Sequence, residues 1–367
     1  MDKNKGLVML KIEQIIEDEY KKELVNKFLN SNTEKYILGR NENAKRLSKF
    51  VSVDGYIDDF TNETNWQGKP IFKSHQIENK EAIVVSCSLA IYPHSALNSL
   101  IKQGFVSVLS VMDIVLYANL DLEIMFLSDA KKDLDLNFAK YEKIHSIMNE
   151  IESKNVFKNI LSFRKNFDLK YMKEYKVDEI GQYFEDFLDL QDGEVFVDAG
   201  GFDGQTSIEF IKHCPKYKSI YIFEPSERNL EIAKKNLKEY KNVNFIAQGL
   251  SSQKDILKFD TESGSASSIS EHGTVTIEVD TLDNLVKEKV SFIKMDIEGG
   301  ESMAIEGMKN HILNDHPKMA ISVYHKVDDF WKIPEQIFAI RDDYDIYMRH
   351  YTEGTDEIVM FFMPKKM

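Results

Sequence analysis

The sequence has little cysteine and no long apolar run. Two cysteines, Cys87 and Cys214, lie far apart among the 367 residues, so we predict neither a disulfide framework nor a zinc site, and expect both to be buried small hydrophobes. No stretch approaches the roughly 18 consecutive apolar residues that span a bilayer, and the start lacks the apolar segment of a secretory signal. We therefore expect a cytoplasmic protein with no membrane span.

Basic residues are also in deficit. Lys and Arg number 47 against 61 Asp and Glu, which gives a formal net charge of −14. Proteins that bind DNA, RNA or anionic membranes need a basic surface that neutralises phosphates and releases counterions. The composition therefore predicts no nucleic-acid partner and no polyanionic substrate, and it favours a neutral hydroxyl compound.

Hydrophobic residues make up 43% of the chain, which is enough for two or three domain cores. We predict an N-terminal part, 1–130, in which a helix over 7–29 precedes a small Rossmann-like α/β unit. The second part, 131–367, is predicted to hold helices at 136–152, 156–163 and 178–188 and a larger α/β domain. The apolar stripe of the first helix is expected to pack on its own chain, with a homodimer seam as the alternative, because heptad spacing is not sustained.

The stretch 194–204, E-V-F-V-D-A-G-G-F-D-G, has the pattern of a buried parallel strand that turns sharply into a helix. Gly200, Gly201 and Gly204 carry no side chains that would hold a ligand away from the backbone N–H groups at the helix start. Thr206 and Glu209 are predicted to cap that helix. The glycine loop is therefore a candidate ligand site.

The spacing of the loop argues against a nicotinamide dinucleotide. The G-x-G-x-x-G pattern counted from Gly200 would need glycine where the chain has Phe202 and Gln205. A second apolar strand ends in Glu224, 20 residues after Gly204, and an acid there suits hydrogen bonds to both ribose hydroxyls of a nucleoside. An adenosine-type cofactor is the ligand that these features predict.

Four stretches resemble the S-adenosylmethionine-dependent methyltransferases of the FkbM family: V-F-V-D-A-G-G-F-D-G-Q-T-S at 195–207, I-F-E-P-S at 222–226, F-I-K-M-D-I-E-G-G-E at 292–301 and S-V-Y-H-K-V-D-D-F-W-K-I-P at 322–334. The resemblance covers about the last half of the chain. It implies a class I methyltransferase fold, a doubly wound and mostly parallel sheet closed by an antiparallel hairpin at 344–350 and 357–362. It also implies S-adenosyl-L-methionine as cofactor and a hydroxyl acceptor, on a sugar or glycan precursor.

The predicted site combines the glycine loop with the ends of later strands. The cofactor-binding candidates are Asp198, Gly200, Gly201, Phe202, Gly204, Thr206, Glu224, Pro225, Gln248, Ser251, Asp296 and Tyr183. For Tyr183, packing under the sheet is an equal alternative.

The catalytic candidates are His325, Asp296 and His350. His325 is expected to be a neutral general base with a pKa near about 6.5, while Asp296 orients the acceptor, orients His325 or is itself the base. Glu298 and Glu301 could instead join Asp296 and His325 as ligands of a hard cation, but we predict that no metal is required.

Several alternatives stay open. The loop Gly39-Arg40-Asn41 of the N-terminal unit keeps one glycine, so a structural or partner-binding role is favoured over a sugar-nucleotide site. Residues 261–270 are read as a substrate lid. Other functions are O-methylation of a polyketide or another small metabolite, non-catalytic cofactor binding in a glycan-assembly complex, and dinucleotide-dependent sugar-nucleotide chemistry.

Overall fold

The computed structural model describes residues 10–12, 15–118, 120, 122, 124, 127–260, 268–269 and 275–366. Two compact units share the chain, and each contains several segments. The first holds 1–138, 155–177 and 350–357, and the second holds 139–154, 178–349 and 358–367. The lid predicted at 261–270 lies outside the described residues except for strand β12 (Ser268–Ile269).

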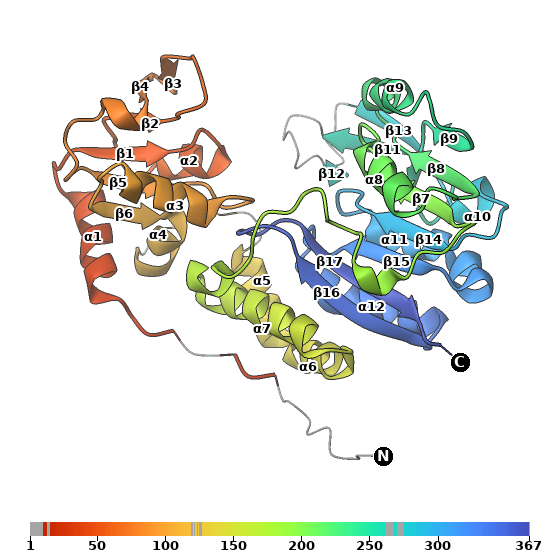
Figure 1. Ribbon diagram of the computed structural model, residues 1–367. Helices are drawn as coiled ribbons and strands as arrows, with labels where there is room; N and C mark the ends of the chain where they lie inside the picture. The colour runs from red at the N-terminus through yellow and green to blue at the C-terminus, as the bar shows by residue number, and fades with distance from the viewer. Residues whose placement is uncertain are drawn as a thin grey trace. The chain divides into compact units, whose positions relative to one another are not determined.

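The first unit contains a six-stranded, mostly parallel sheet in the order β3-β4-β2-β1-β5-β6 (Figure 1). Only the β3–β4 pair is antiparallel among the strand pairs described there. Tyr36, Ile57 and Val84 lie in the hydrophobic core of this unit. An apolar sheet face must be covered, and the helices between the strands cover it. The strands are β1 (Lys35–Leu38), β2 (Gly55–Ile57), β3 (Asn65–Trp66), β4 (Lys69–Phe72), β5 (Ile83–Ser86) and β6 (Ser107–Ser110).

The first helix is shorter than the 7–29 that its apolar spacing predicts. It begins at Glu19 because the Asp18 side chain accepts a hydrogen bond from the Lys21 N–H and caps the helix. In chain order, the helices up to residue 172, of which α6 and the start of α7 fall in the second unit, are α1 (Glu19–Asn30), α2 (Glu42–Leu47), η1 (Ser74–Gln76), α3 (Pro93–Lys102), α4 (Val111–Tyr117), α5 (Leu127–Leu136), α6 (Phe138–Ile147), α7 (Ile151–Asn166) and η2 (Leu169–Met172).

The helix predicted over 178–188 is wrong. Tyr183 has a φ of 74°, which a helix cannot contain, and turns lead into a single 3₁₀ turn, η3 (Asp186–Leu188). The turn at Tyr183 buries its aromatic side chain, and the segment has no helical face. Tertiary burial therefore overrides the local helical pattern at this point.

The second unit contains a seven-stranded sheet in the order β16-β17-β15-β14-β7-β8-β9. Strands β7, β8, β9, β14 and β15 run parallel, and β17 runs antiparallel to β15. This is the doubly wound, mostly parallel sheet that the sequence predicts, with its last two strands at one edge. The bounds are β7 (Val195–Ala199), β8 (Ser219–Phe223), β9 (Val243–Ile246), β14 (Phe292–Met295), β15 (Lys318–Ser322), β16 (Tyr344–His350) and β17 (Ile358–Pro364).

A smaller sheet in the same unit has the order β10-β13-β11-β12. Its β11 and β13 strands pair antiparallel. The remaining elements are β10 (Gly249–Leu250), β11 (Asp255–Asp260), β13 (Val275–Asp280), α8 (Gln205–His213), α9 (Glu227–Asn236), α10 (Leu282–Leu285), α11 (Glu301–Gly307), η5 (His311–Asp315) and α12 (Asp329–Ile340).

Aromatic stacking fixes the centre of the second unit. The Phe196 ring on β7 lies 4.2 Å from Phe210 of α8 and 5.0 Å from Phe292 of β14, and all three are fully buried. Aromatic pairs of this kind stabilise a core beyond their burial alone. The middle of the sheet is thus closed to ligands, and its strand ends are left to form a site.

No helix among the described residues is both long enough and apolar enough to cross a membrane.

Candidate functional site

The carboxyl ends of four neighbouring parallel strands carry the predicted site. Asp198 lies in β7, Glu224 follows β8, Asp296 follows β14, and His325 comes shortly after β15. Parallel strands that are adjacent end at the same edge of a sheet, where open α/β folds bind their ligands. The second unit therefore brings these four side chains to one rim.

Packing against the chain itself explains the glycines of the loop. Gly200 has a φ of 77°, and a Cβ there would lie 1.8 Å from the Asp296 carbonyl oxygen. A Cβ on Gly201 would meet Ile222 at 2.3 Å, and one on Gly204 would meet Leu237 at 2.8 Å. The loop is thus pressed onto β14, β8 and α9.

The helix after the loop has a glycine at its N-cap. Gly204 is its N-cap, Thr206 lies in the first turn, and Glu209 pairs with Lys212 and His213, so the capping box predicted for Thr206 and Glu209 does not form. Asp203 Oδ1 accepts the Gln205 N–H at the start of α8 at 3.1 Å, while the N-cap itself contributes no side chain.

A buried ion pair beneath the loop was not predicted. Lys294 Nζ lies 3.2 Å from Asp198 Oδ1 and donates to the Gly200 carbonyl at 2.7 Å. Asp198 also accepts from Ser207 Oγ at 2.7 Å and is completely buried. Asp198 therefore fixes the loop from below, and the signal that could have revealed its partner is the lysine inside the apolar strand Phe292–Met295.

Glu224 connects β8 to the loop. Its carboxylate accepts hydrogen bonds from the N–H of Phe202 at 3.0 Å and from the N–H of Ser226 at 2.8 Å. Burial raises the pKa of the Glu224 carboxyl above its usual value, although these N–H groups and the charge of Lys294 oppose the rise. Phe202 holds a φ of 45° and exposes 62% of its surface, so its ring lies outside the core.

The remaining cofactor candidates lie near these strand ends with varied exposure. Pro225 is half-buried next to Glu224. Gln248 precedes β10 and donates its side-chain amide to Glu278 at 3.1 Å. Ser251 follows β10, is buried, and donates its N–H to the Asp280 carbonyl at 3.0 Å. Of the two polar side chains, that of Gln248 is the more accessible.

Asp296 is held by hydroxyl groups from two other segments. Tyr183 donates to Asp296 Oδ2 at 2.8 Å, and the Tyr324 hydroxyl lies 3.4 Å from the same oxygen. Tyr183 is buried, 3.3 Å from Ser322 Oγ, and its ring lies beneath the Lys294 ammonium. Tyr183 thus orients Asp296 from inside the protein.

His325 lies among three carboxyl groups. Its Nδ1 is 3.0 Å from Glu301 Oε1, and its Nε2 is 3.4 Å from Asp296 Oδ1 and 3.5 Å from Glu298 Oε2. Burial alone would lower the pKa of His325, but Glu301, followed by Asp296 and Glu298, raises that pKa to about 10. The sequence-based expectation of a neutral imidazole with a pKa near about 6.5 is therefore not met, because its acidic neighbours favour the imidazolium.

Glu301 is the most buried member of this group, with 1% of its side chain exposed. Its Oε1 accepts from the N–H of Ile297 at 3.0 Å and is 3.4 Å from the N–H of Gly299. Burial and then the charge of Glu301 raise the pKa of the neighbouring Asp329 carboxyl to about 7. The ends of β14 and β15 thus hold more carboxyl groups than basic ones.

His350 has different surroundings from His325. It belongs to the first unit, where its ring lies 4.6 Å from the Tyr175 ring and its Nε2 is 3.1 Å from Thr352 Oγ1. Burial lowers the pKa of His350 to about 3. A group with so low a pKa is a weak base, so the structure favours a packing role for His350 over a catalytic one.

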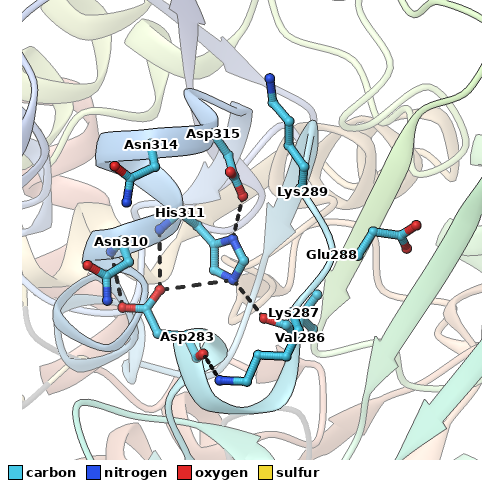
Figure 2. A pocket seen from close by; sticks show the side chains of 9 residues that line it. All are labelled: Asp283, Val286, Lys287, Glu288, Lys289, Asn310, His311, Asn314 and Asp315. Atoms are coloured by element: carbon cyan, nitrogen blue, oxygen red, sulfur yellow. Dashed lines mark hydrogen bonds and ion pairs between the residues drawn. The ribbon is translucent and has the colours of Figure 1, made fainter.

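Figure 2 shows a second polar hollow, formed by α10, the segment after it and η5. His311 Nδ1 lies 2.6 Å from Asp315, its Nε2 lies 3.2 Å from the Val286 carbonyl, and Asp283 accepts the N–H groups of Asn310 and His311. Asp315 also accepts from the Val290 N–H just before β14 begins, which places the hollow at the amino end of that strand. These groups bind one another and join secondary-structure elements.

Comparison with solved structures gives the fold. A methyltransferase FkbM from Methylobacillus flagellatus KT matches with a TM-score of 0.74 at 22% sequence identity, over 93% of this chain and 92% of that chain. An rRNA methylase from Streptococcus thermophilus matches with a TM-score of 0.35 at 17% identity, over 49% of this chain and 93% of that one. A search of curated protein sequences finds no match. The first similarity confirms the class I methyltransferase-like fold.

The family model of the methyltransferase FkbM domain matches residues 198–362. The match begins at Asp198 and includes the positions of Glu224, Asp296 and His325, while Tyr183 precedes it. The segment 198–362 therefore belongs to the FkbM family of methyltransferases.

Proposed function

We propose that this protein transfers a methyl group from S-adenosylmethionine to a hydroxyl group of a small molecule, with a sugar or glycan precursor as the acceptor. The observation that carries the proposal is the shared rim of β7, β8, β14 and β15. It joins the glycine loop at the start of α8 and the buried Glu224 carboxylate to the group of Asp296 and His325. The helix start and the Glu224 carboxylate suit a nucleoside, and Asp296 and His325 suit the acceptor.

The residues present fit an adenosine-type cofactor. Glu224 has a carboxylate held by two backbone N–H groups, and its remaining lone pairs suit the two ribose hydroxyls. The loop from Gly200 to Gly204 lets a ligand approach its backbone closely, because its three glycines have no side chains. When bound, S-adenosylmethionine supplies a methyl group on a sulfonium, which is electrophilic enough for direct transfer to oxygen.

Asp296 is the proton acceptor that this arrangement supports. An acceptor hydroxyl must lose its proton as its oxygen forms the new bond to carbon, and the Asp296 carboxylate, oriented by Tyr183, can take that proton. His325 carries a positive charge among its carboxyl neighbours, so it orients Asp296 and the acceptor oxygen. In this role His325 contributes to positioning and charge, and Asp296 contributes the base.

Calorimetry with S-adenosylhomocysteine and with NAD tests the cofactor. We expect the first to bind and the second not to, because the loop lacks the dinucleotide glycines. Glu224→Gln should weaken binding of S-adenosylhomocysteine by about 5- to 150-fold, the equivalent of about 1–3 kcal/mol, because one acceptor oxygen is lost. Glu227→Gln, at an exposed position on α9, is the matched control and should bind normally. Equal binding of NAD would refute the assignment.

Transfer of a radiolabelled methyl group to a panel of sugars, sugar nucleotides and polyketide alcohols tests the reaction. Asp296→Asn should lower turnover by about a hundredfold or more, while affinity for S-adenosylhomocysteine stays within a few fold. Labelling of polyketide alcohols with no labelled sugar would replace the proposed acceptor class. If the wild-type protein binds the cofactor yet labels no member of the panel, and Asp296→Asn leaves binding unchanged, a non-catalytic role is supported instead.

A further inference from the structure

Glu301, the first residue of α11, has a carboxylate that solvent barely reaches, with 1% of its side chain exposed. Its Oε1 accepts the Ile297 N–H at 3.0 Å and lies 3.4 Å from the Gly299 nitrogen, so the turn after β14 closes around it. Its Oε2 is buried and has no hydrogen-bond partner among the described residues. A buried carboxylate is costly unless a partner offsets its charge, and the His325 imidazole at 3.0 Å is such a partner.

The His325 ring faces carboxylates from both of its nitrogens. Nδ1 lies 3.0 Å from Glu301 Oε1, while Nε2 lies 3.4 Å from Asp296 Oδ1 and 3.5 Å from Glu298 Oε2. A neutral imidazole has one N–H and one lone pair, so it would turn that lone pair towards a carboxylate on one side. The imidazolium has an N–H on each nitrogen and avoids this repulsion. Neither nitrogen makes a well-aligned hydrogen bond among the described residues, so the attraction is that of ion pairs.

The carboxyl groups around His325 come from three segments. Asp296 and Glu298 follow β14, Glu301 begins α11, and the buried Asp329 begins α12. Burial lowers the pKa of His325, but Glu301 opposes this most strongly, ahead of Asp296 and Glu298, and that pKa is raised to about 10. Glu301 thus makes both the shortest contact with the ring and the largest contribution to its charge.

We propose that Glu301 is a positioning residue of the methyl-transfer site, which keeps a proton on both nitrogens of His325 and fixes the charged ring beside Asp296. The inference rests on the proposed function, because it gives Glu301 a part in the same reaction. Glu301 is too buried to touch the acceptor, so it acts through His325. Glu298 differs, because 36% of its side chain is exposed to solvent.

The charge on His325 acts at the proton-transfer step. As the acceptor oxygen forms its bond to the methyl carbon, the carbon–sulfur bond breaks with its electron pair left on sulfur, and the hydroxyl proton passes to Asp296. Asp296 must be ionised before that step, and an imidazolium 3.4 Å from its Oδ1 favours the ionised form. Tyr183 holds the other oxygen, Oδ2, at 2.8 Å. Glu301 therefore supports the base through the ring that lies between them.

NMR of the full chain with ¹⁵N-labelled histidine measures the protonation of His325 without an acceptor or a cofactor. Spectra recorded with a chelator present, and assigned with His325→Gln, should show an N–H on both ring nitrogens of the wild-type chain at about pH 8. Glu301→Gln keeps the size of the side chain and an oxygen for the Ile297 N–H, and it should lower the midpoint of the His325 titration by at least about one pH unit. Glu298→Gln should lower it by less. Glu306→Gln, at an exposed position on α11, should leave it unchanged.

A neutral His325 in the wild-type chain at about pH 8 would overturn the inference, as would an unchanged midpoint in a folded Glu301→Gln variant. Circular dichroism identifies a variant that does not fold. In that case the wild-type spectrum and Glu301→Asp, which keeps the negative charge, provide the test. The His325 midpoint of Glu301→Asp should stay above the value of about 6.5 for an isolated imidazole, and a midpoint at or below that value would contradict the inference.

The pH profile of methyl transfer, measured with an acceptor that the wild-type chain labels, tests the role of Glu301 in the reaction. Relative to the wild type, turnover of Glu301→Gln should fall by about tenfold or more as the pH rises through the lowered His325 midpoint, while affinity for S-adenosylhomocysteine stays within a few fold. A turnover ratio that is the same at every pH would indicate a structural role and overturn the inference. A wild-type chain that binds no S-adenosylhomocysteine, or labels no acceptor, counts against the proposed function, whereas the NMR titration decides the effect of Glu301 on His325 in either case.

Discussion

Lys294 and Asp198 form an ion pair that solvent barely reaches, with 4% and 0% of their side chains exposed. Removal of one partner leaves an uncompensated buried charge, and such changes cost about 3–5 kcal/mol of folding free energy. We expect Lys294→Met to lower the free energy of unfolding by that amount in urea titrations. The same change should release the Gly200 carbonyl and weaken S-adenosylhomocysteine binding.

The double variant Lys294→Met with Asp198→Asn provides the control. It removes both charges, so its free energy of unfolding should lie above that of Lys294→Met alone. Additive losses from the two single changes would show that the residues do not act as a pair.

His350 makes stability depend on pH. Its pKa is lowered to about 3 in the folded protein, whereas the unfolded chain should titrate near about 6.5. Between these values the unfolded state binds more protons, so this stabilisation is present above about pH 6.5 and is lost as the pH falls towards about 3. The loss should approach about 1.4 kcal/mol per pH unit within that window.

Urea titrations at several pH values measure this effect. A folded His350→Gln variant should show a smaller decline below about pH 6.5, because its side chain cannot titrate. His75→Gln, at an exposed position, should follow the wild-type curve. A His350→Gln curve parallel to that of the wild type would show that other groups control acid stability.

At the scale of elements, the glycine loop depends on its contact with β14. Gly200→Ala places a Cβ 1.8 Å from the Asp296 carbonyl oxygen, whereas a Cβ on Gly193 meets nothing within 4 Å. Both glycines have φ between 77° and 89°, in the left-handed region. Alanine is strained there, so both variants should lose about 1–2 kcal/mol of folding free energy. The free energy of unfolding measured in urea titrations should fall by about 1–3 kcal/mol more for Gly200→Ala than for Gly193→Ala, because the added Cβ overlaps the Asp296 carbonyl.

Cofactor affinity of the two glycine variants should differ as well. Displacement of the loop moves both the Phe202 N–H that Glu224 holds and the backbone of Asp296, so calorimetry with S-adenosylhomocysteine should show weaker binding only for Gly200→Ala. Equal stability of the two variants would mean that the loop can shift away from β14 without cost.

At the scale of the whole molecule, the first unit has side chains where a pyrophosphate-binding loop would have glycine. Arg40 pairs with Asp58 at 2.8 Å and with Glu63 at 2.7 Å, and Asn41 caps α2 while it donates to the Cys87 carbonyl. Because these groups are already engaged within the unit, we expect the full chain to bind no sugar nucleotide there.

Calorimetry of the full chain with UDP-glucose checks this expectation. One S-adenosylhomocysteine site and no UDP-glucose binding is the expected result. Micromolar UDP-glucose binding that persists in Glu224→Gln but falls in Arg40→Ala would assign a second ligand site to the first unit and contradict the prediction.

Local patterns were sufficient for much of this protein. A short apolar run that ends in an acid and glycines identifies β7 and its loop, because buried parallel strands are short and continuous in hydrophobicity. The same reasoning placed Glu224, Asp296 and His325 at strand ends, and the family resemblance was confirmed over 198–362. These features depend on neighbours in sequence, so the chain order alone determines them.

Only the tertiary structure decided which groups meet. Tyr183 reaches Asp296 across 113 positions of sequence and Lys294 reaches Gly200 across 94, and no local pattern specifies such pairs. The pKa of His325 follows from Glu301, whose carboxylate at the start of α11 lies 3.0 Å from the His325 ring after β15. Charge, burial and partner choice depend on distances between segments, and those distances exist only once the sheet has formed.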